Sequence, residues 1–430
     1  MSKNRIIAHS DLNCFYASVE MLRNPRLRNV PMAVCGSKED RHGIVLAANY
    51  PAKRMGVKTA MANWQAKQSC PDLRTVRPRM TDYIQFSGFV REIYADYSDR
   101  IEAFGLDENW IDLSGCVSSF EQGATLVHEI RERVKRELGL SVSIGLSDNK
   151  IFAKLGSDMK KPDACTIIPK DKFKELVWPL PVSDLLYVGP ATTKKFNNRG
   201  ILTIGDLAQY PIELLQSMLG KVGTVLWAYA NGKDKTSVSN IEFESAVKSI
   251  ENSTTCPRDL ESDQDVWIVL LALVESVGMR LMEQGFYATT VEFSCVGTNL
   301  SFNETRHCKL VKPTNISKEI ADAAFSLFKK HYSNWSSPLR KIGVRGSNLV
   351  LDSAPRQLTV FDDAQADERK EHLERSINGL RARFGNKSIQ RGIMYVDRDL
   401  SKVDAKKNHT IFPVGVFKDG MPSLPASIAN

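Results

Sequence analysis

The sequence has no long hydrophobic run and no recognisable export signal. Its most apolar stretch, Val266 to Val274, is followed closely by Glu275 and Arg280, and it is far shorter than the roughly 20 apolar residues of a membrane-spanning helix. The N-terminus lacks the apolar segment of about 7–15 residues that a secretory signal requires. The sequence therefore predicts a soluble cytoplasmic protein with no membrane partner.

Cysteine and histidine are both scarce. The eight cysteines are scattered without a CxxC pair, and the seven histidines are equally dispersed. This spacing does not match a zinc site or a disulfide scaffold. We expect free thiols in a reducing compartment.

What the chain does have is length and a moderate positive charge. At 430 residues it predicts roughly three domains of about 150 residues each. Lys and Arg number 58 against 50 Asp and Glu, a formal excess of +8. Such an excess suits a polyanionic partner but does not identify one.

Hydrophobic periodicity predicts two α+β regions separated by an all-helical region at about 170–235. In the first region the order strand, helix, strand, strand, helix, strand is typical of a ferredoxin-like sheet with one long insertion. Its expected strands are 5–11, 101–104, 110–113 and 140–145, and its expected helices are 15–22, 83–97, 120–138 and 149–159.

The polar stretch from Gly232 to Asn240 predicts an interdomain linker, because it has little to bury. A second β-α-β-β-α-β region follows it. Its expected strands are 246–250, 289–296, 307–311 and 341–351, and its expected helices are 266–282 and 316–332. A charged helix is expected at 367–384.

Three carboxylates stand where metal chemistry would need them. Asp11 ends the first strand, and Asp107 and Glu108 occupy the turn between two short strands. Neighbouring strands can bring these groups to one sheet edge, where they would bind a hard cation such as Mg²⁺. Two cations about 3.5–4 Å apart can activate a 3′ hydroxyl and stabilise a leaving pyrophosphate. The alternative is a solvated acidic turn and an aspartate that merely ends a strand.

Two basic segments suggest phosphate partners. Lys150, Lys154 and Lys161 recur around the helix after the last strand, where ammonium groups suit a triphosphate. An ordinary solvated lysine face is the alternative. Residues 181–207 alternate helices with glycine-bearing turns, as in a helix-hairpin-helix that grips a DNA backbone. An ordinary helical hairpin in a bundle is the alternative there.

In this order, the motifs resemble those of the Y-family DNA polymerases, most closely the bacterial translesion branch called DNA polymerase IV. The matching segments are DLNCFYASVE at 11–20, ANYPA at 48–52, LDE at 106–108, residues 143–162 and the hairpin at 187–200. The resemblance implies an α+β right-hand polymerase. Its parts would be a ferredoxin-like palm (1–22 and 79–168), small fingers (23–78), a helix-hairpin-helix thumb (169–231), a linker (232–243), a βαββαβ little finger (244–353) and a tail (354–430).

The resemblance also assigns roles by position. The metal ligands would be Asp11, Asp107, Glu108 and the backbone carbonyl of Leu12, with two Mg²⁺ per site. Tyr16 takes the steric-gate position, where a ring leaves no room for a 2′ hydroxyl; the alternative is a core aromatic. The nucleotide-contacting positions are Phe15, Tyr50, Lys53, Arg54 and Lys161. The DNA-contacting positions are Gly189, Lys194, Lys195 and Arg199.

Some positions depart from the family pattern. Lys53 stands where Arg is usual, with Arg54 next to it, and lysine cannot form a bidentate fork on phosphate. Gly105 and Asn109 flank the acidic pair where Ser and a small residue are common. Tyr187 replaces a frequent glycine in the hairpin, which leaves open how that turn contacts phosphate.

Beyond the polymerase core, Gln357-Leu-Thr-Val-Phe361 resembles the peptide that bacterial polymerases insert into the sliding clamp. Gln357 would enter a polar subsite, and Leu358 and Phe361 an apolar pocket. We expect this peptide to lie on an exposed linker, where tethering raises the effective concentration at the primer end.

The sequence thus predicts a monomeric DNA-directed DNA polymerase that uses primer-template DNA and deoxynucleoside triphosphates. The family resemblance implies low fidelity, no proofreading and a role in DNA damage tolerance. A nucleotidyl cyclase could use the same palm, but it needs neither the hairpin nor the clamp-like peptide. A non-catalytic DNA- or clamp-binding scaffold would not need the three carboxylates and Tyr16.

Overall fold

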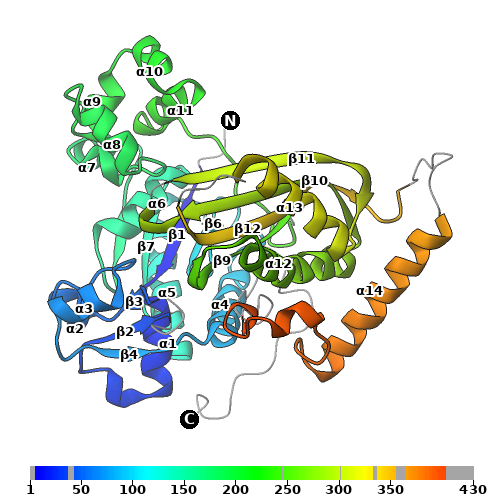
Figure 1. The fold of residues 1–430 in the computed structure, drawn as a ribbon. Coiled ribbons are helices and arrows are strands. Elements are labelled where there is room, and N and C mark those ends of the chain that lie inside the picture. Colours follow the sequence, from blue (N-terminus) through cyan, green and yellow to red (C-terminus); the bar gives the residue numbers. More distant parts are fainter. Residues whose placement is uncertain are drawn as a thin grey trace. The chain divides into compact units, whose positions relative to one another are not determined.

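The computed structural model describes residues 5–36, 43–243, 246–300, 302–332, 337–354 and 364–402 (Figure 1). These residues form two compact units, the first within 5–36 and 44–243 and the second within 246–402. No described helix combines the length and apolar composition needed to cross a membrane.

The first unit is built on a five-stranded sheet in which β1 is the central strand. The strand order is β5-β6-β1-β7-β8, and β1 pairs antiparallel with both β6 and β7. The strands are β1 (Ile7–Leu12), β5 (Ile101–Ala103), β6 (Glu108–Asp112), β7 (Val142–Ser147) and β8 (Cys165–Ile167). The short edge strand β8 was not among the expected strands, and it pairs parallel to β7.

Helices cover both faces of this sheet. They are α1 (Phe15–Arg23), α4 (Met80–Ala95), α5 (Phe120–Leu138) and α6 (Lys150–Met159). Alternate residues of a strand point to opposite faces. Ile6 and Ala8 accordingly lie in the core formed with α4 and α5, while Ile7 and Trp110 pack against Ala153 of α6.

A second, smaller sheet of the first unit has the order β3-β2-β4. It contains β2 (Met32–Cys35), β3 (Val45–Ala48) and β4 (Arg74–Val76), with helices α2 (Tyr50–Arg54) and α3 (Asn63–Ser69). The buried Asn49 side chain joins α2 to β2, because its oxygen accepts from the amides of Ala52 and Met32, each at 3.1 Å. The sequence had not predicted β4.

The region after β8 is helical, as predicted. Its helices are α7 (Phe173–Val177), α8 (Pro190–Asn197), α9 (Ile204–Gln209), α10 (Ile212–Leu219) and α11 (Lys221–Ala230). They pack around buried side chains that include Phe196 and Leu215.

The stretch expected to be a linker buries more than its polar composition suggested. Val238 is only 3% exposed and packs with Ile7 and Trp110. The Arg5 guanidinium donates to the Asp234 carbonyl at 3.2 Å. The expectation that this stretch has little to bury is therefore wrong, because a single well-placed valine and backbone hydrogen bonds fix it to the first unit.

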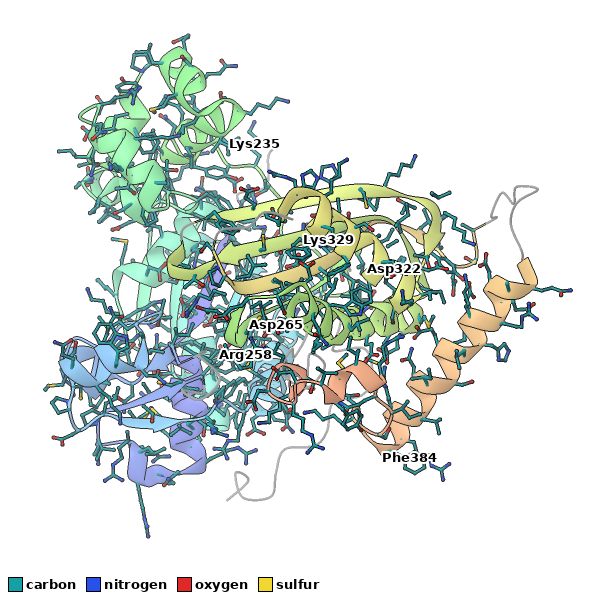
Figure 2. The ribbon with its side chains drawn as sticks, in the orientation of Figure 1. Lys235, Arg258, Asp265, Asp322, Lys329 and Phe384 are labelled. Atoms are coloured by element: carbon teal, nitrogen blue, oxygen red, sulfur yellow. The ribbon has the colours of Figure 1, made fainter. Side chains whose placement is uncertain are left out.

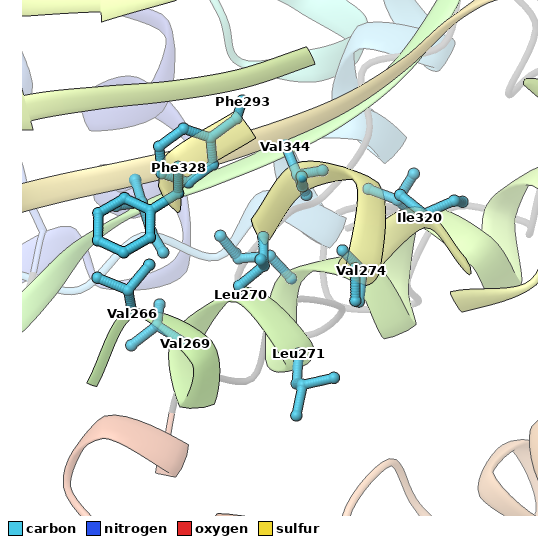
Figure 3. Close-up of a cluster of buried hydrophobic side chains, with 14 of the residues drawn as sticks. Val266, Val269, Leu270, Leu271, Val274, Phe293, Ile320, Phe328 and Val344 are labelled. Carbon is cyan, nitrogen blue, oxygen red and sulfur yellow. The ribbon is translucent and has the colours of Figure 1, made fainter. Parts of the chain in front are cut away.

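The second unit has the predicted β-α-β-β-α-β order. Its elements are β9 (Ser249–Leu260), α12 (Asp263–Glu283), β10 (Phe286–Gly297), β11 (Asn303–Thr314), α13 (Ser317–Tyr332) and β12 (Leu339–Leu351). The sheet is antiparallel in the order β11-β10-β12-β9. Figure 3 shows Val266, Leu270 and Val274 of α12 packed in its core near Phe293 and Val344.

The C-terminal described segment completes this core. It contains α14 (Ala364–Phe384) and short 3₁₀ turns at Gly392–Tyr395 and Leu400–Lys402. Met394 and Leu400 are buried in the second core. The Arg258 guanidinium pairs with the carboxylates of Asp265 and Asp397, each at 2.7 Å. Figure 2 labels Arg258 and Asp265. The clamp-like peptide at 357–361 lies outside the described residues.

Gly145 lets α6 approach the central sheet closely. A β-carbon at Gly145 would lie 1.9 Å from the Ala153 carbonyl oxygen and 2.5 Å from the Ser157 amide nitrogen. Both contacts are with helix backbone, so no side-chain rotation can relieve them. The close approach brings α6 onto the face of β1 that carries His9, the register partner of Gly145.

We therefore predict that Gly145→Ala lowers the free energy of unfolding by about 1–3 kcal/mol or more, the usual range for overpacking. The measurement is urea denaturation. Gly115→Ala is the control, because a β-carbon there has no neighbour within 4 Å. Equal midpoints for Gly145→Ala and the wild type would contradict the role of this glycine.

Candidate active site

Backbone pairing between β1 and β6 brings the predicted carboxylates together. Asp11 is the register partner of Glu108, and the Leu12 amide donates to the Asp107 carbonyl at 2.9 Å. Directly opposed residues on antiparallel strands have β-carbons about 4.5–5.5 Å apart. The structure thus places Asp11 and Glu108 on one face at one end of the sheet, with Asp107 beside them. Their role as metal ligands stays a prediction.

The electrostatics of these groups are those of a crowded acidic site. Burial raises the pKa of Asp11 to about 6, and the charges of Glu108 and Asp107 add to this rise against the opposing effect of Lys161. Burial and the charge of Glu108 also raise the pKa of Asp107. Burial would raise the pKa of Glu108 as well, but His9 and Lys154 outweigh it and lower that pKa to about 2.

The donor chemistry fits a hard divalent cation. Carboxylate and backbone carbonyl oxygens are the ligands that Mg²⁺ prefers, and a cation would relieve the mutual repulsion of these carboxylates. Within the described part of the chain, no group of three or more His, Cys, Asp or Glu is already arranged to hold a metal. Instead, ammonium groups contact two of the carboxylates: Lys161 contacts Asp11 and Lys154 contacts Glu108.

Tyr16 lies on the first turn of α1 beside this acidic group. Its ring is partly buried and stacks on the Tyr83 ring, with centroids 4.4 Å apart and planes 13° apart. The Tyr83 hydroxyl donates to the buried Glu20 carboxylate at 2.7 Å. Burial and the charge of Asp107 raise the pKa of Tyr16 to about 12. The Tyr16 ring is thus stacked on Tyr83 and lies near the charge of Asp107, and its role as a steric gate stays a prediction.

The other predicted nucleotide contacts differ in exposure. Phe15 is only 3% exposed and its ring belongs to the first core, so its side chain does not face solvent. Tyr50 begins α2; burial raises its pKa, and neighbouring Cys14 and Asp11 add to the rise. Lys53 and Arg54 are exposed, and the Lys53 ammonium lies 5.2 Å from the centre of the Tyr50 ring.

The lysines after β7 do not form one solvated face. Lys150 contacts Glu102 at 2.6 Å and lies 4.4 Å from the centre of the Trp110 ring. Lys161 contacts Asp11 at 2.6 Å and Asp158 at 2.8 Å. Both ammonium groups therefore have specific carboxylate partners, and Lys161 is the more exposed of the two, at 31% of its side chain against 10% for Lys150.

The predicted DNA-contacting residues lie around α8. Gly189 is the N-cap of this helix, and Lys194, Lys195 and Arg199 are exposed. Tyr187 has φ +68° and is 60% exposed, so a non-glycine residue adopts the left-handed conformation that favours glycine. Tyr187 thus has a backbone conformation that a glycine would adopt readily, and DNA contact remains a prediction.

Sequence reasoning missed two residues that support this site. Tyr83 stacks on the Tyr16 ring, and fully buried His9 has its Nε2 atom 3.4 Å from Glu108 Oε2. Burial lowers the pKa of His9. Because Asp11 and His9 are two residues apart on a strand, period-two alternation could have identified His9 as a neighbour. Tyr83 gave no such signal, since it is far from Tyr16 in sequence.

Comparison with known proteins gives a consistent family. Residues 10–158 match the impB/mucB/samB family, and residues 247–360 match the C-terminal domain of that family. Residues 183–234 match a family described as the thumb domain of DNA polymerase iota. These matches lie in the same order as the structural regions described above.

Similar proteins cover most of the chain. DNA polymerase IV of Acetivibrio thermocellus is 48% identical over 399 residues, which are 93% of this chain and 100% of that protein. DNA polymerase IV 2 of Bacillus subtilis is 36% identical over 397 residues, 91% of this chain and 95% of that protein. A solved chimeric Y-family DNA polymerase aligns with a TM-score of 0.72 at 23% identity, over 80% of this chain and 99% of that structure. This last likeness confirms the predicted α+β right-hand fold.

Proposed function

Because the chain belongs to the impB/mucB/samB family of Y-family DNA polymerases, we propose that it is a DNA-directed DNA polymerase of the translesion type. It adds deoxynucleotides to a primer 3′ end as directed by a template. The observation that supports this most strongly is the pairing of Asp11 with Glu108 on adjacent strands, with Asp107 beside them.

Asp11, Asp107, Glu108 and the Leu12 carbonyl would hold two Mg²⁺ ions. When bound, such ions polarise the attacking hydroxyl and neutralise charge on the triphosphate. The chain's own contribution is mainly to position the reactants. Tyr16 excludes a 2′ hydroxyl by its fixed ring, and Tyr50, Lys161 and one or both of Lys53 and Arg54 hold the phosphates. The amides near Gly189 and the side chains of Lys194, Lys195 and Arg199 hold the DNA backbone.

Two further properties belong to this proposal. As the family resemblance implies, synthesis is of low fidelity and takes place without proofreading. The enzyme acts as a cytoplasmic monomer recruited by the sliding clamp through Gln357, Leu358 and Phe361. The proposed domain boundaries are those stated above: the fingers (23–78) interrupt the palm (1–22 and 79–168), and the thumb and the little finger follow along the chain.

We predict that Asp107→Ala or Glu108→Ala lowers primer extension on the order of a thousandfold, because lost cation binding removes several kcal/mol of transition-state stabilisation. DNA binding, measured by fluorescence anisotropy, should change little. Asp96→Ala is the control, since Asp96 is an exposed carboxylate paired with Arg133 on the surface. Undiminished extension by both site variants would remove the metal assignment.

Tyr16→Ala should admit ribonucleotides. Loss of the ring opens space for a 2′ hydroxyl, and we expect the preference for deoxynucleotides to fall on the order of a hundredfold. Single-nucleotide insertion assays with each sugar measure this ratio. Tyr83→Phe keeps the stacked ring and removes only the hydroxyl, so it should retain wild-type selection. Strict rejection of ribonucleotides by Tyr16→Ala would refute the gate.

Replacing Gln357 and Phe361 together by Ala should abolish stimulation by the sliding clamp and spare synthesis without it. The reason is that tethering raises local concentration without touching the catalytic centre. Primer extension with and without clamp measures the effect. Leu373→Ala combined with Phe384→Ala is the control, because both side chains are 62% exposed on α14 outside the peptide. Equal stimulation of the test variant and the wild type would show the peptide to be a bystander.

A further inference from the structure

A closed ring of contacts joins Glu108 of β6 and His9 of β1 to Lys154 and Ser157 of α6. The Lys154 ammonium donates to Glu108 Oε2, and His9 Nε2 lies 3.4 Å from the same oxygen. His9 Nδ1 is 2.8 Å from Ser157 Oγ. Ser157 Oγ donates to the Lys154 carbonyl at 2.7 Å. The ring therefore starts and ends at Lys154, and we name it the Glu108 ring.

The number of available protons determines which atom donates in the hydrogen bonds of Ser157. The Ser157 hydroxyl has one proton, and it is used by the Lys154 carbonyl. Its oxygen must then accept from His9, so the His9 proton that faces Ser157 sits on Nδ1. His9 Nε2 faces Glu108 Oε2 at 3.4 Å and has no hydrogen-bond partner among the described residues, and the carboxylate accepts its hydrogen bond from the Lys154 ammonium.

Lys154 is more buried than expected for a lysine that binds a triphosphate. The Lys154 side chain is 13% exposed, against 31% for Lys161. His9 and Ser157 are fully buried. The Lys154 ammonium also lies 5.5 Å from the centre of the Phe104 ring and 3.8 Å from Asp158. These contacts keep the Lys154 ammonium next to Glu108.

We propose that Lys154, supported by Ser157 and His9, is a positioning residue that fixes the orientation of the Glu108 carboxylate. This inference rests on the proposed polymerase function. Both contacts engage Oε2, and no described residue donates to Oε1. Because Oε2 is held in place, the direction of Oε1 is fixed as well, and such preorganisation is what a catalytic ligand needs.

The kinetic test separates positioning from substrate binding. In single-turnover insertion, Lys154→Met should lower the maximal rate about tenfold to a hundredfold, the cost of a misplaced catalytic group, and leave nucleotide affinity unchanged. Lys154→Arg, which keeps a cationic donor, should recover much of the rate. Lys161→Met should instead weaken nucleotide affinity. Lys135→Met is the control, because its ammonium is exposed and contacts Asp163 on the surface rather than Glu108, and it should keep the wild-type rate.

A second readout does not depend on activity. In nitrogen-15 NMR of the protein without added metal, the His9 ring should carry a slowly exchanging proton on Nδ1, assigned by its absence in His9→Gln. Ser157→Ala should remove this protection and lower the maximal rate while the melting temperature stays near that of the wild type. This variant also keeps the test informative if Lys154→Met does not fold.

Three outcomes would overturn the Glu108 ring. They are wild-type rates in both Lys154→Met and Ser157→Ala, a loss of nucleotide affinity in Lys154→Met equal to that in Lys161→Met, and a His9 proton found on Nε2 alone. Failure of the proposed function looks different, because Asp107→Ala would then retain primer extension. The ring fails by itself if Asp107→Ala is inactive and both ring variants are normal.

Discussion

The pairing of β1 with β6 is the constraint on which the site depends. It sets Asp11 opposite Glu108 and ties Leu12 to Asp107 by a backbone hydrogen bond. Three carboxylates gathered in this way repel one another, and partial burial raises the pKa values of Asp11 and Asp107. A fold keeps such a group only if positive charge is near. Lys154, in the middle of α6, and Lys161, just after its C-terminal end, supply that charge.

The support for this pairing comes from the helix beneath it. α6 can approach β1 and β7 because Gly145 has no side chain, and this approach brings Ser157 to His9. Trp110 continues the same layer, packing on the His9 ring with centroids 5.2 Å apart and donating its indole proton to the Lys150 carbonyl at 2.9 Å. The acidic end of the sheet therefore packs on a layer of buried side chains. Such a layer can hold the carboxylates in fixed positions.

The sequence predicted elements whose ends carry local signals. Helix α5 has the predicted bounds because Ser119 caps its start and Gly139 adopts φ +66° at its end. Strand β9 extends to Leu260, well beyond the predicted end at residue 250. The sequence did not predict this extension, because polar residues and Pro257 are not typical of a strand. The Glu108 ring could not be predicted in full: His9 and Ser157 are 148 positions apart, and only the packing of α6 on β1 joins them. The placement of the carboxylates was foreseen from strand adjacency, whereas their lysine partners were assigned to phosphate.

The most direct test of the central claim is anomalous diffraction from Mn²⁺ in crystals of the protein with primer-template DNA and an incoming nucleotide. The account predicts anomalous density between the Asp11, Asp107 and Glu108 carboxylates, within the roughly 2.0–2.6 Å that oxygen ligands allow for such cations. Anomalous density bound elsewhere on the chain, with none among these three side chains, would contradict it.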